Sequence, residues 1–179
     1  DHYDPLAVFS SIDRYGRYAF GNQAPITRWN LEVLAEALLP LLDPEGKRAA
    51  TVAREALEPF DDIFKSEYLA VLRRKLGLST ARDGDQQLAD DLLSLMRRHR
   101  ADYTLAFRYL GDALEDDGPF RSLFAPGAEV EAWLGRWRAR QDMDPAAAAK
   151  AMQAANPAVI PRNHRVEEAL KAAEGGDLS

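Results

Sequence analysis

The sequence contains no cysteine, and this absence excludes several kinds of site before any pattern is considered. A chain without thiols has no disulfide framework, no zinc–thiolate centre and no cysteine nucleophile. It also lacks an apolar run of about 18 residues, the length that a helix needs to cross a bilayer. The first residues, Asp1 to Pro5, lack the basic start and apolar stretch of a secretory signal. We therefore expect no membrane partner and interpret the N-terminus as a cut through a longer chain.

Positive charge is also scarce. Lysine and arginine number 23 against 29 acidic residues, which gives a formal net charge of -6. Binding to nucleic-acid phosphates needs clustered cations, and the one basic cluster, Arg97 to Arg100, has acidic residues on both sides. We interpret this cluster as a solvated helix face rather than a phosphate site, and expect no nucleic-acid partner.

Residues that could carry chemistry are few. The three histidines, His2, His99 and His164, have no second histidine or acid at metal-ligand spacing. Neither a glycine-rich phosphate loop nor a nucleophile elbow occurs. Adjacent acids, as in Asp61-Asp62, Asp90-Asp91 and Asp116-Asp117, could offer oxygens to magnesium. Because neighbouring residues on a helix point to different faces, we favour solubilising roles for these pairs. The sequence thus predicts no catalytic, cofactor-binding or metal-binding residue.

The hydrophobic pattern predicts an all-α, irregular multi-helix domain of about seven to eight helices with an extended N-terminal arm. Residues 1–25 form the arm, because Phe9, Tyr15, Tyr18 and Phe20 are interspersed there with glycine and proline. Residues 26–174 form the helical domain, and residues 175–179 a flexible tail. Thr27 is the expected N-cap of the first helix, and Pro40 should end or kink it near Leu39. The expected helices cover residues 26–39, 47–57, 59–76, 85–99, 102–114, 128–140, 145–155 and 164–173.

Two segments are more particular than a generic helical bundle requires. The first, Gly16 to Gln23 with Trp29 shortly after it, contributes four candidate interaction or structural residues: Arg17, Tyr18, Asn22 and Trp29. The second, Asn156 to His164, contributes three more: Arg162, Asn163 and His164. In a structural reading of the second segment, Asn163 caps the next helix and Arg162 forms an ion pair between helices. In a functional reading, the same residues contact a catalytic lobe or a substrate.

These two segments resemble the C-terminal part of selenoprotein O-like proteins, a family long described as uncharacterised. Further stretches fit in the same order, namely Lys75 to Leu78, Asp102 to Arg108 and Trp133 to Arg138, so the resemblance covers essentially the whole chain. It implies a protein adenylyltransferase, a nucleotidyltransferase with a protein-kinase-like (pseudokinase) fold. Such an enzyme uses ATP and Mg²⁺ or Mn²⁺ to transfer AMP to Ser, Thr or Tyr hydroxyls, a reaction known as AMPylation.

The resemblance further implies that all nucleotide and metal motifs lie N-terminal to this segment. The chain would then correspond to the C-terminal lobe region, with residues 1–25 as a remnant of the activation segment. This fragment alone is predicted to be inactive and to need no cofactor. The alternative is a helical protein–protein interaction module without an enzymatic role.

From the resemblance we expect two partners, the missing N-terminal kinase-like lobes and protein substrates. The exposed arm could in addition bind a second copy of the chain. The implied location is the cytoplasm for a bacterial-type protein and the mitochondrion for eukaryotic relatives. Some members carry cysteine or selenocysteine for a proposed redox link, and the lack of cysteine here gives that link no support.

Overall fold

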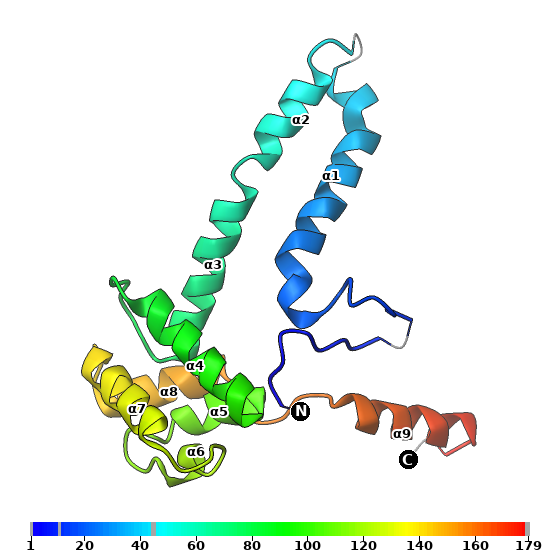
Figure 1. Ribbon diagram of the computed structural model, residues 1–179. Helices are drawn as coiled ribbons and strands as arrows, with labels where there is room; N and C mark the ends of the chain where they lie inside the picture. The colour runs from blue at the N-terminus through cyan, green and yellow to red at the C-terminus, as the bar shows by residue number, and fades with distance from the viewer. Residues whose placement is uncertain (1, 11, 44–45, 178–179) are drawn as a thin grey trace. The chain divides into compact units, whose positions relative to one another are not determined.

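The computed structural model describes residues 2–10, 12–43 and 46–177, and these residues confirm the all-α prediction (Figure 1). No strand occurs among them; the only ladder-like contact is an isolated antiparallel bridge between His2 and Asp102. One 3₁₀ turn, Phe20–Asn22, precedes the first α-helix. The α-helices are α1 (Gln23–Leu42), α2 (Ala49–Leu57), α3 (Phe60–Lys75), α4 (Asp85–His99), α5 (Tyr103–Leu110), α6 (Gly118–Arg121), α7 (Ala128–Arg140), α8 (Pro145–Ala155) and α9 (Asn163–Glu174).

By their contacts the residues fall into two compact units, residues 4–70 and residues 1–3 together with 71–179. Helix α3 contributes to both units. The expected arm contributes to both as well, because Tyr3 donates its backbone N–H to Ala101 O (2.8 Å) while the following residues belong to the first unit. The expected tail follows α9, and its last two positions, 178 and 179, lie outside the described residues.

Helix α1 differs from its predicted bounds at both ends. It begins at Gln23 with Asn22 as N-cap, so the prediction of Thr27 as cap is wrong. Pro25 fits inside the first turn because the first N–H groups of a helix have no intrahelical partner in any case. The helix also continues past Pro40 to Leu42, so the predicted end near Leu39 is wrong. A proline this close to the C-terminus removes one helical hydrogen bond without stopping the last turn.

The first unit buries very little. Among the described residues, its only buried apolar side chains are those of Ala19, Ile26 and Ala49. Helices α1 and α2 pack against each other, and Figure 1 shows them running side by side. The apolar stripe that made α1 predictable is therefore solvent-exposed, as the large side chains along it show: Trp29, Val33, Leu34, Leu38 and Leu41.

The second unit has an extensive core, in which α4 packs on α7 and α5 packs on α6 and α8. Trp133 and Trp137 lie at its centre with parallel rings 6.0 Å apart, and both are fully buried. Each indole N–H donates to a backbone carbonyl, Trp133 to Leu88 O and Trp137 to Leu76 O, both at 2.9 Å. A buried indole therefore keeps its hydrogen bond while filling the core.

Two helix boundaries in this unit follow from local residue types. The Asp144 carboxylate caps α8 by accepting from Ala147 N at 3.3 Å, with Pro145 as the first helical residue. Gly77 follows the last turn of α3 with a φ of 71°, the left-handed conformation that a helix C-terminus commonly adopts. A side chain there would also meet Met152, whose atoms lie 3.0 Å from the position of a Cβ.

None of the helices in residues 2–10, 12–43 and 46–177 is both long enough and apolar enough to span a bilayer.

Candidate functional site

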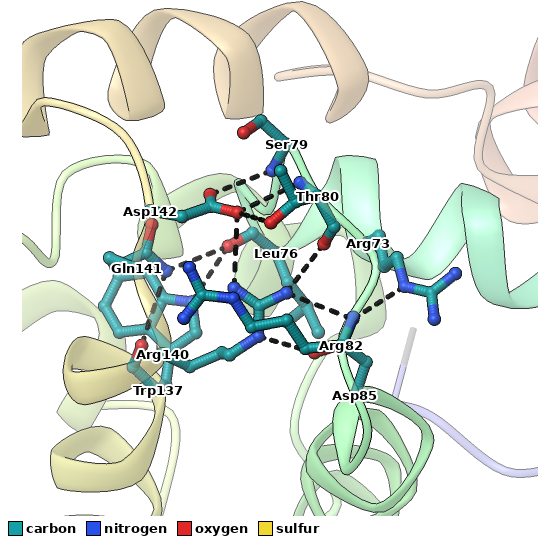
Figure 2. A network of polar contacts seen from close by, with 10 residues as sticks. All are labelled: Arg73, Leu76, Ser79, Thr80, Arg82, Asp85, Trp137, Arg140, Gln141 and Asp142. Carbon is teal, nitrogen blue, oxygen red and sulfur yellow. Dashed lines mark hydrogen bonds and ion pairs between the residues drawn. The ribbon is translucent and has the colours of Figure 1, made fainter.

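A buried polar network joins the end of α3, the loop after it, the start of α4 and the end of α7 (Figure 2). Asp85, which is 1% exposed, lies at its centre. Its carboxylate accepts from Arg73 Nε at 2.7 Å, from Arg140 Nε at 2.6 Å and from Arg82 N at 2.9 Å. Burial by itself raises the pKa of Asp85, but the hydrogen bonds from Arg140, Arg82 and Arg73 outweigh it and hold the pKa below its ordinary value.

A second carboxylate, that of Asp142, belongs to this network. Its carboxylate accepts from the backbone N–H groups of Ser79 and Thr80, each at 3.0 Å, and from the Thr80 hydroxyl. Hydrogen bonds from Ser79 and Thr80 are the main reason that the pKa of Asp142 lies well below its usual range. Arg140 links the two acids, because it also contacts Asp142 and donates to Thr80 O at 2.7 Å. The network thus fixes the loop between α3 and α4.

A smaller ion-pair cluster ties α6 to α7. Asp117 accepts from Arg121 Nε at 2.5 Å and pairs with Arg138, which also donates to Ala113 O at 3.0 Å. These two guanidinium groups lower the pKa of Asp117 to about 2. The carboxylates of both clusters are already neutralised by arginine, so they are suited to holding helices together rather than to proton transfer.

The acidic pairs considered as magnesium sites have arginine partners in the structure. No group of three or more His, Asp or Glu side chains suited to a metal ion occurs in the described part of the chain. One member of each pair instead forms an ion pair with an arginine: Asp61 with Arg28 (2.7 Å), Asp91 with Arg136 (2.7 Å), and Asp117 as above.

The structure brings together the four candidate residues of the first segment. The Arg17 guanidinium carbon lies 4.1 Å from the centroid of the Trp29 ring and 5.8 Å from that of Tyr18. Asn22 donates from its side-chain amide to Arg17 O at 2.5 Å. Gln23, which the sequence analysis did not single out, donates to Tyr18 O at 2.9 Å and closes the loop onto α1. We call this group of Arg17, Tyr18, Asn22 and Trp29 the stacked cluster.

The candidate residues of the second segment are not equivalent to one another. Arg162 forms two hydrogen bonds with Asp102, at 2.7 and 3.3 Å, in agreement with an ion pair between segments. The prediction of Asn163 as N-cap is wrong, because α9 begins at Asn163 and its cap is Arg162, without a side-chain capping hydrogen bond. Arg162 has an extended backbone, and the helix begins one residue earlier than the predicted range of 164–173. The side chain of His164 is exposed.

We predict that Arg162→Ala lowers the free energy of unfolding by about 1–2 kcal/mol, because the pair is partly buried and Asp102 also caps α5 through Leu105 N. His164→Ala, two residues along, serves as the matched control and should change it by less than about 0.5 kcal/mol. Urea unfolding of both variants measures the difference. If Arg162→Ala keeps its stability but abolishes activity in the full-length protein, the functional reading of this segment is correct instead.

Sequence reasoning missed the partner of Lys75. The amide of Asn156, which is fully buried, accepts from Lys75 Nζ at 3.2 Å and donates to Lys75 O at 3.0 Å. The ammonium group also lies over the rings of Phe107 and Tyr103, and burial lowers the pKa of Lys75. Asn156 opens one of the two particular segments and Lys75 opens a stretch that fits the family resemblance, but nothing in the sequence pairs positions 81 residues apart.

The whole chain, residues 1–179, matches the family described as "Protein adenylyltransferase SelO". Similar proteins, each described as "Protein nucleotidyltransferase YdiU", occur in several bacteria. The chain is 56% identical to one from Cereibacter sphaeroides, 51% to one from Methylorubrum populi and 48% to one from Agrobacterium fabrum. These matches cover 99%, 97% and 99% of this chain but only 36%, 37% and 38% of the relatives. The chain therefore spans little more than a third of the length of the curated relatives it matches.

Proposed function

Because this chain belongs to the protein adenylyltransferase SelO family, we propose that it is the helical C-terminal part of an enzyme that transfers AMP from ATP to protein hydroxyls. The remaining, kinase-like part would bind ATP with Mg²⁺ or Mn²⁺ in the cytoplasm and carry out the chemistry. The part seen here would brace that catalytic part and contact protein substrates. The name shared by the relatives, together with the small share of their length that this chain covers, supports this division of labour.

The observation that carries the proposal is the exposed apolar stripe of α1. Leu34 is 53% exposed and Leu41 is 79% exposed, on a face that Leu38 extends and that does not include Trp29. The residues that face α2, among them Arg28, Glu32, Ala35 and Leu39, lie on another side of the helix. A continuous apolar stripe on a stable protein marks a binding surface, since burying it contributes about 25 cal/mol for each Å². We infer that the catalytic part of the same polypeptide covers this face.

The test introduces a charge into this face. Leu34→Glu should leave the stability of the isolated chain within about 0.5 kcal/mol of wild type, because Leu34 is exposed there. In the full-length protein the same change buries an unpaired carboxylate, so we expect a lower melting temperature and loss of most AMP transfer from labelled ATP. Ile63→Glu, which changes an exposed apolar residue of α3 in the same way, is the control and should affect neither.

Two results would contradict the proposal in different ways. If full-length wild-type protein transfers no AMP to any protein, the enzymatic assignment is wrong. If AMP transfer occurs but Leu34→Glu leaves both the activity and the melting temperature unchanged, the α1 face does not brace the catalytic part.

The second candidate function is an interaction module that acts through the arm, and it is favoured by one observation. Tyr15 is 97% exposed, and Phe9 and Tyr18 are also exposed. Such side chains could join two copies of the chain. Light scattering that shows concentration-dependent dimers of the full-length protein would favour this reading, and a monomer at all concentrations would exclude it.

A further inference from the structure

The stacked cluster has the features of a binding site rather than of a simple loop anchor. The Arg17 guanidinium carbon lies over the Trp29 ring, 4.1 Å from its centroid, and the indole is still 47% exposed. An arginine in this arrangement keeps its donor N–H groups at the edge of the plane, where they remain open to an acceptor. The aromatic ring fixes the plane of the guanidinium, so less side-chain freedom is lost when an acceptor binds.

No acid in the described residues pairs with the Arg17 side chain, which takes part only in its two aromatic contacts. The nearest acid in the sequence, Asp13, is committed elsewhere. Its carboxylate accepts from Arg17 N at 2.9 Å and from Tyr18 N at 2.8 Å, and the hydrogen bond from Tyr18 in particular lowers the pKa of Asp13. By contrast, Arg28 on the same helix as Trp29 is paired with Glu32 and Asp61. Arg17 is thus held by aromatic rings and has no acidic partner within residues 2–10, 12–43 and 46–177.

A hollow of about 340 Å³ lies beside this cation. Its lining consists of Arg17, Asn22, Pro25, Ile26 and Trp29. These residues supply one guanidinium, one amide that is fixed by its bond to Arg17 O, and otherwise apolar and aromatic surface. A side chain with an apolar stem and a single negative charge at its tip matches this lining. A phosphate dianion does not, since the lining holds only one cation and no lysine.

We propose that the Arg17–Trp29 hollow binds a glutamate or aspartate side chain of an acidic segment in the protein substrate. This inference rests on the proposed role of the chain in substrate recognition. It adds a preference: proteins with acidic segments should be modified in preference to neutral or basic ones. The guanidinium donates to the carboxylate, and the stem of the bound side chain lies against Trp29 and Pro25.

Fluorescence anisotropy of a labelled peptide tests the proposal on the full-length protein. The probe is an eight-residue peptide that alternates glutamate with glycine, and its control has glutamine in place of each glutamate. We expect wild-type protein to bind the acidic peptide and not the control. Loss of one charge-assisted hydrogen-bonded contact should weaken binding about tenfold or more in Arg17→Gln. Arg17→Lys keeps the charge without the planar fork and should give an intermediate affinity.

Arg14→Gln is the matched control variant, because Arg14 is an exposed arginine three positions away whose side chain forms no hydrogen bond, ion pair or ring contact with the described residues. It should bind the acidic peptide within about twofold of wild type. An unchanged melting temperature of Arg17→Gln shows that the loss is local. Should that variant be unstable, Arg17→Lys and competition by free peptide still decide the question.

Several outcomes would overturn the proposal. They are equal binding of both peptides, equal loss in Arg14→Gln and Arg17→Gln, and displacement of the probe by inorganic phosphate at a concentration at which glutamate has no effect. An AMP-transfer assay on the same samples separates the two proposals. Peptide binding that depends on Arg17 without any AMP transfer supports this site and rejects the enzymatic assignment. AMP transfer with no dependence of peptide binding on Arg17 rejects the site alone.

Discussion

Asp85→Asn should lower the free energy of unfolding of the chain by about 3–5 kcal/mol, the cost of breaking a buried ion pair by removing one partner. The asparagine keeps the shape of the side chain but not its charge, so Arg73 and Arg140 lose their common counter-ion. Arg140 is only 12% exposed along its side chain and cannot easily turn toward water. The amide N–H₂ of the introduced asparagine would also point at N–H donors that a carboxylate oxygen of Asp85 had accepted from.

Asp83→Asn is the control for this change. Asp83 lies two residues before Asp85, is exposed, and takes part in no ion pair among the described residues. The same substitution there should change the free energy of unfolding by less than about 0.5 kcal/mol. Urea unfolding followed by circular dichroism compares the two variants. Equal stability of both variants would show that the network around Asp85 contributes little to the fold.

Asp85→Asn should also change how the free energy of unfolding depends on pH. The pKa of Asp85 is lower in the folded protein than its ordinary value of about 3.9. The ionised Asp85 therefore contributes fully to the free energy of unfolding above about pH 4, and this contribution is lost as the pH falls through the lower pKa of the folded state. Asp142 and Asp117 behave in the same way, Asp117 with a folded pKa of about 2. Wild type should thus lose stability steeply below about pH 4, and Asp85→Asn should lose it less steeply because one of these groups has been removed.

The helices could be predicted from the sequence because each depends on neighbours in the chain. The apolar period along α1, the Asp144–Pro145 start of α8 and the glycine after α3 are all local signals. The ends of α1 were placed wrongly for a related reason. Its start is set by side chains of Asn22 and Gln23 that fold back onto the preceding loop, and a pattern of apolar residues does not contain this information.

What covers an apolar face could not be predicted. The period along α1 shows that one side is apolar, and the sequence offers no way to tell whether that side meets α2 or another part of the protein. In the structure that side remains exposed, and this is why it carries the proposal of a catalytic partner.

Long-range polar pairs were equally hidden. In the sequence Arg140 is one cation at the end of an expected helix, a position that favours the helix dipole. In the structure it reaches Asp85, which is 55 residues earlier in the chain, and Asp142 only two residues later. In a sequence, an aspartate that caps a helix at the surface cannot be told from one that is a buried counter-ion. Only the packing of α4 on α7 makes Asp85 the buried counter-ion of Arg140.

Trp137→Ala should lower the free energy of unfolding by about 3–5 kcal/mol, a large share of the about 5–15 kcal/mol typical of a domain. The side chain is fully buried, stacks on Trp133 and donates to Leu76 O, which links α7 to the end of α3. Trp137→Phe should cost less, about 1–3 kcal/mol, because a ring remains and Gln141 Nε2 still donates to Leu76 O at 3.2 Å.

Trp29→Ala provides the contrast that separates a core tryptophan from a surface one. Its indole is half exposed and its main contact is with Arg17, so its loss should cost about 1 kcal/mol or less. Circular dichroism is the suitable measurement, since each substitution removes part of the fluorescence signal. If Trp137→Ala were no more destabilising than Trp29→Ala, the second unit would not depend on its tryptophan core, and the Asp85 network would have to hold α3, α4 and α7 together by itself.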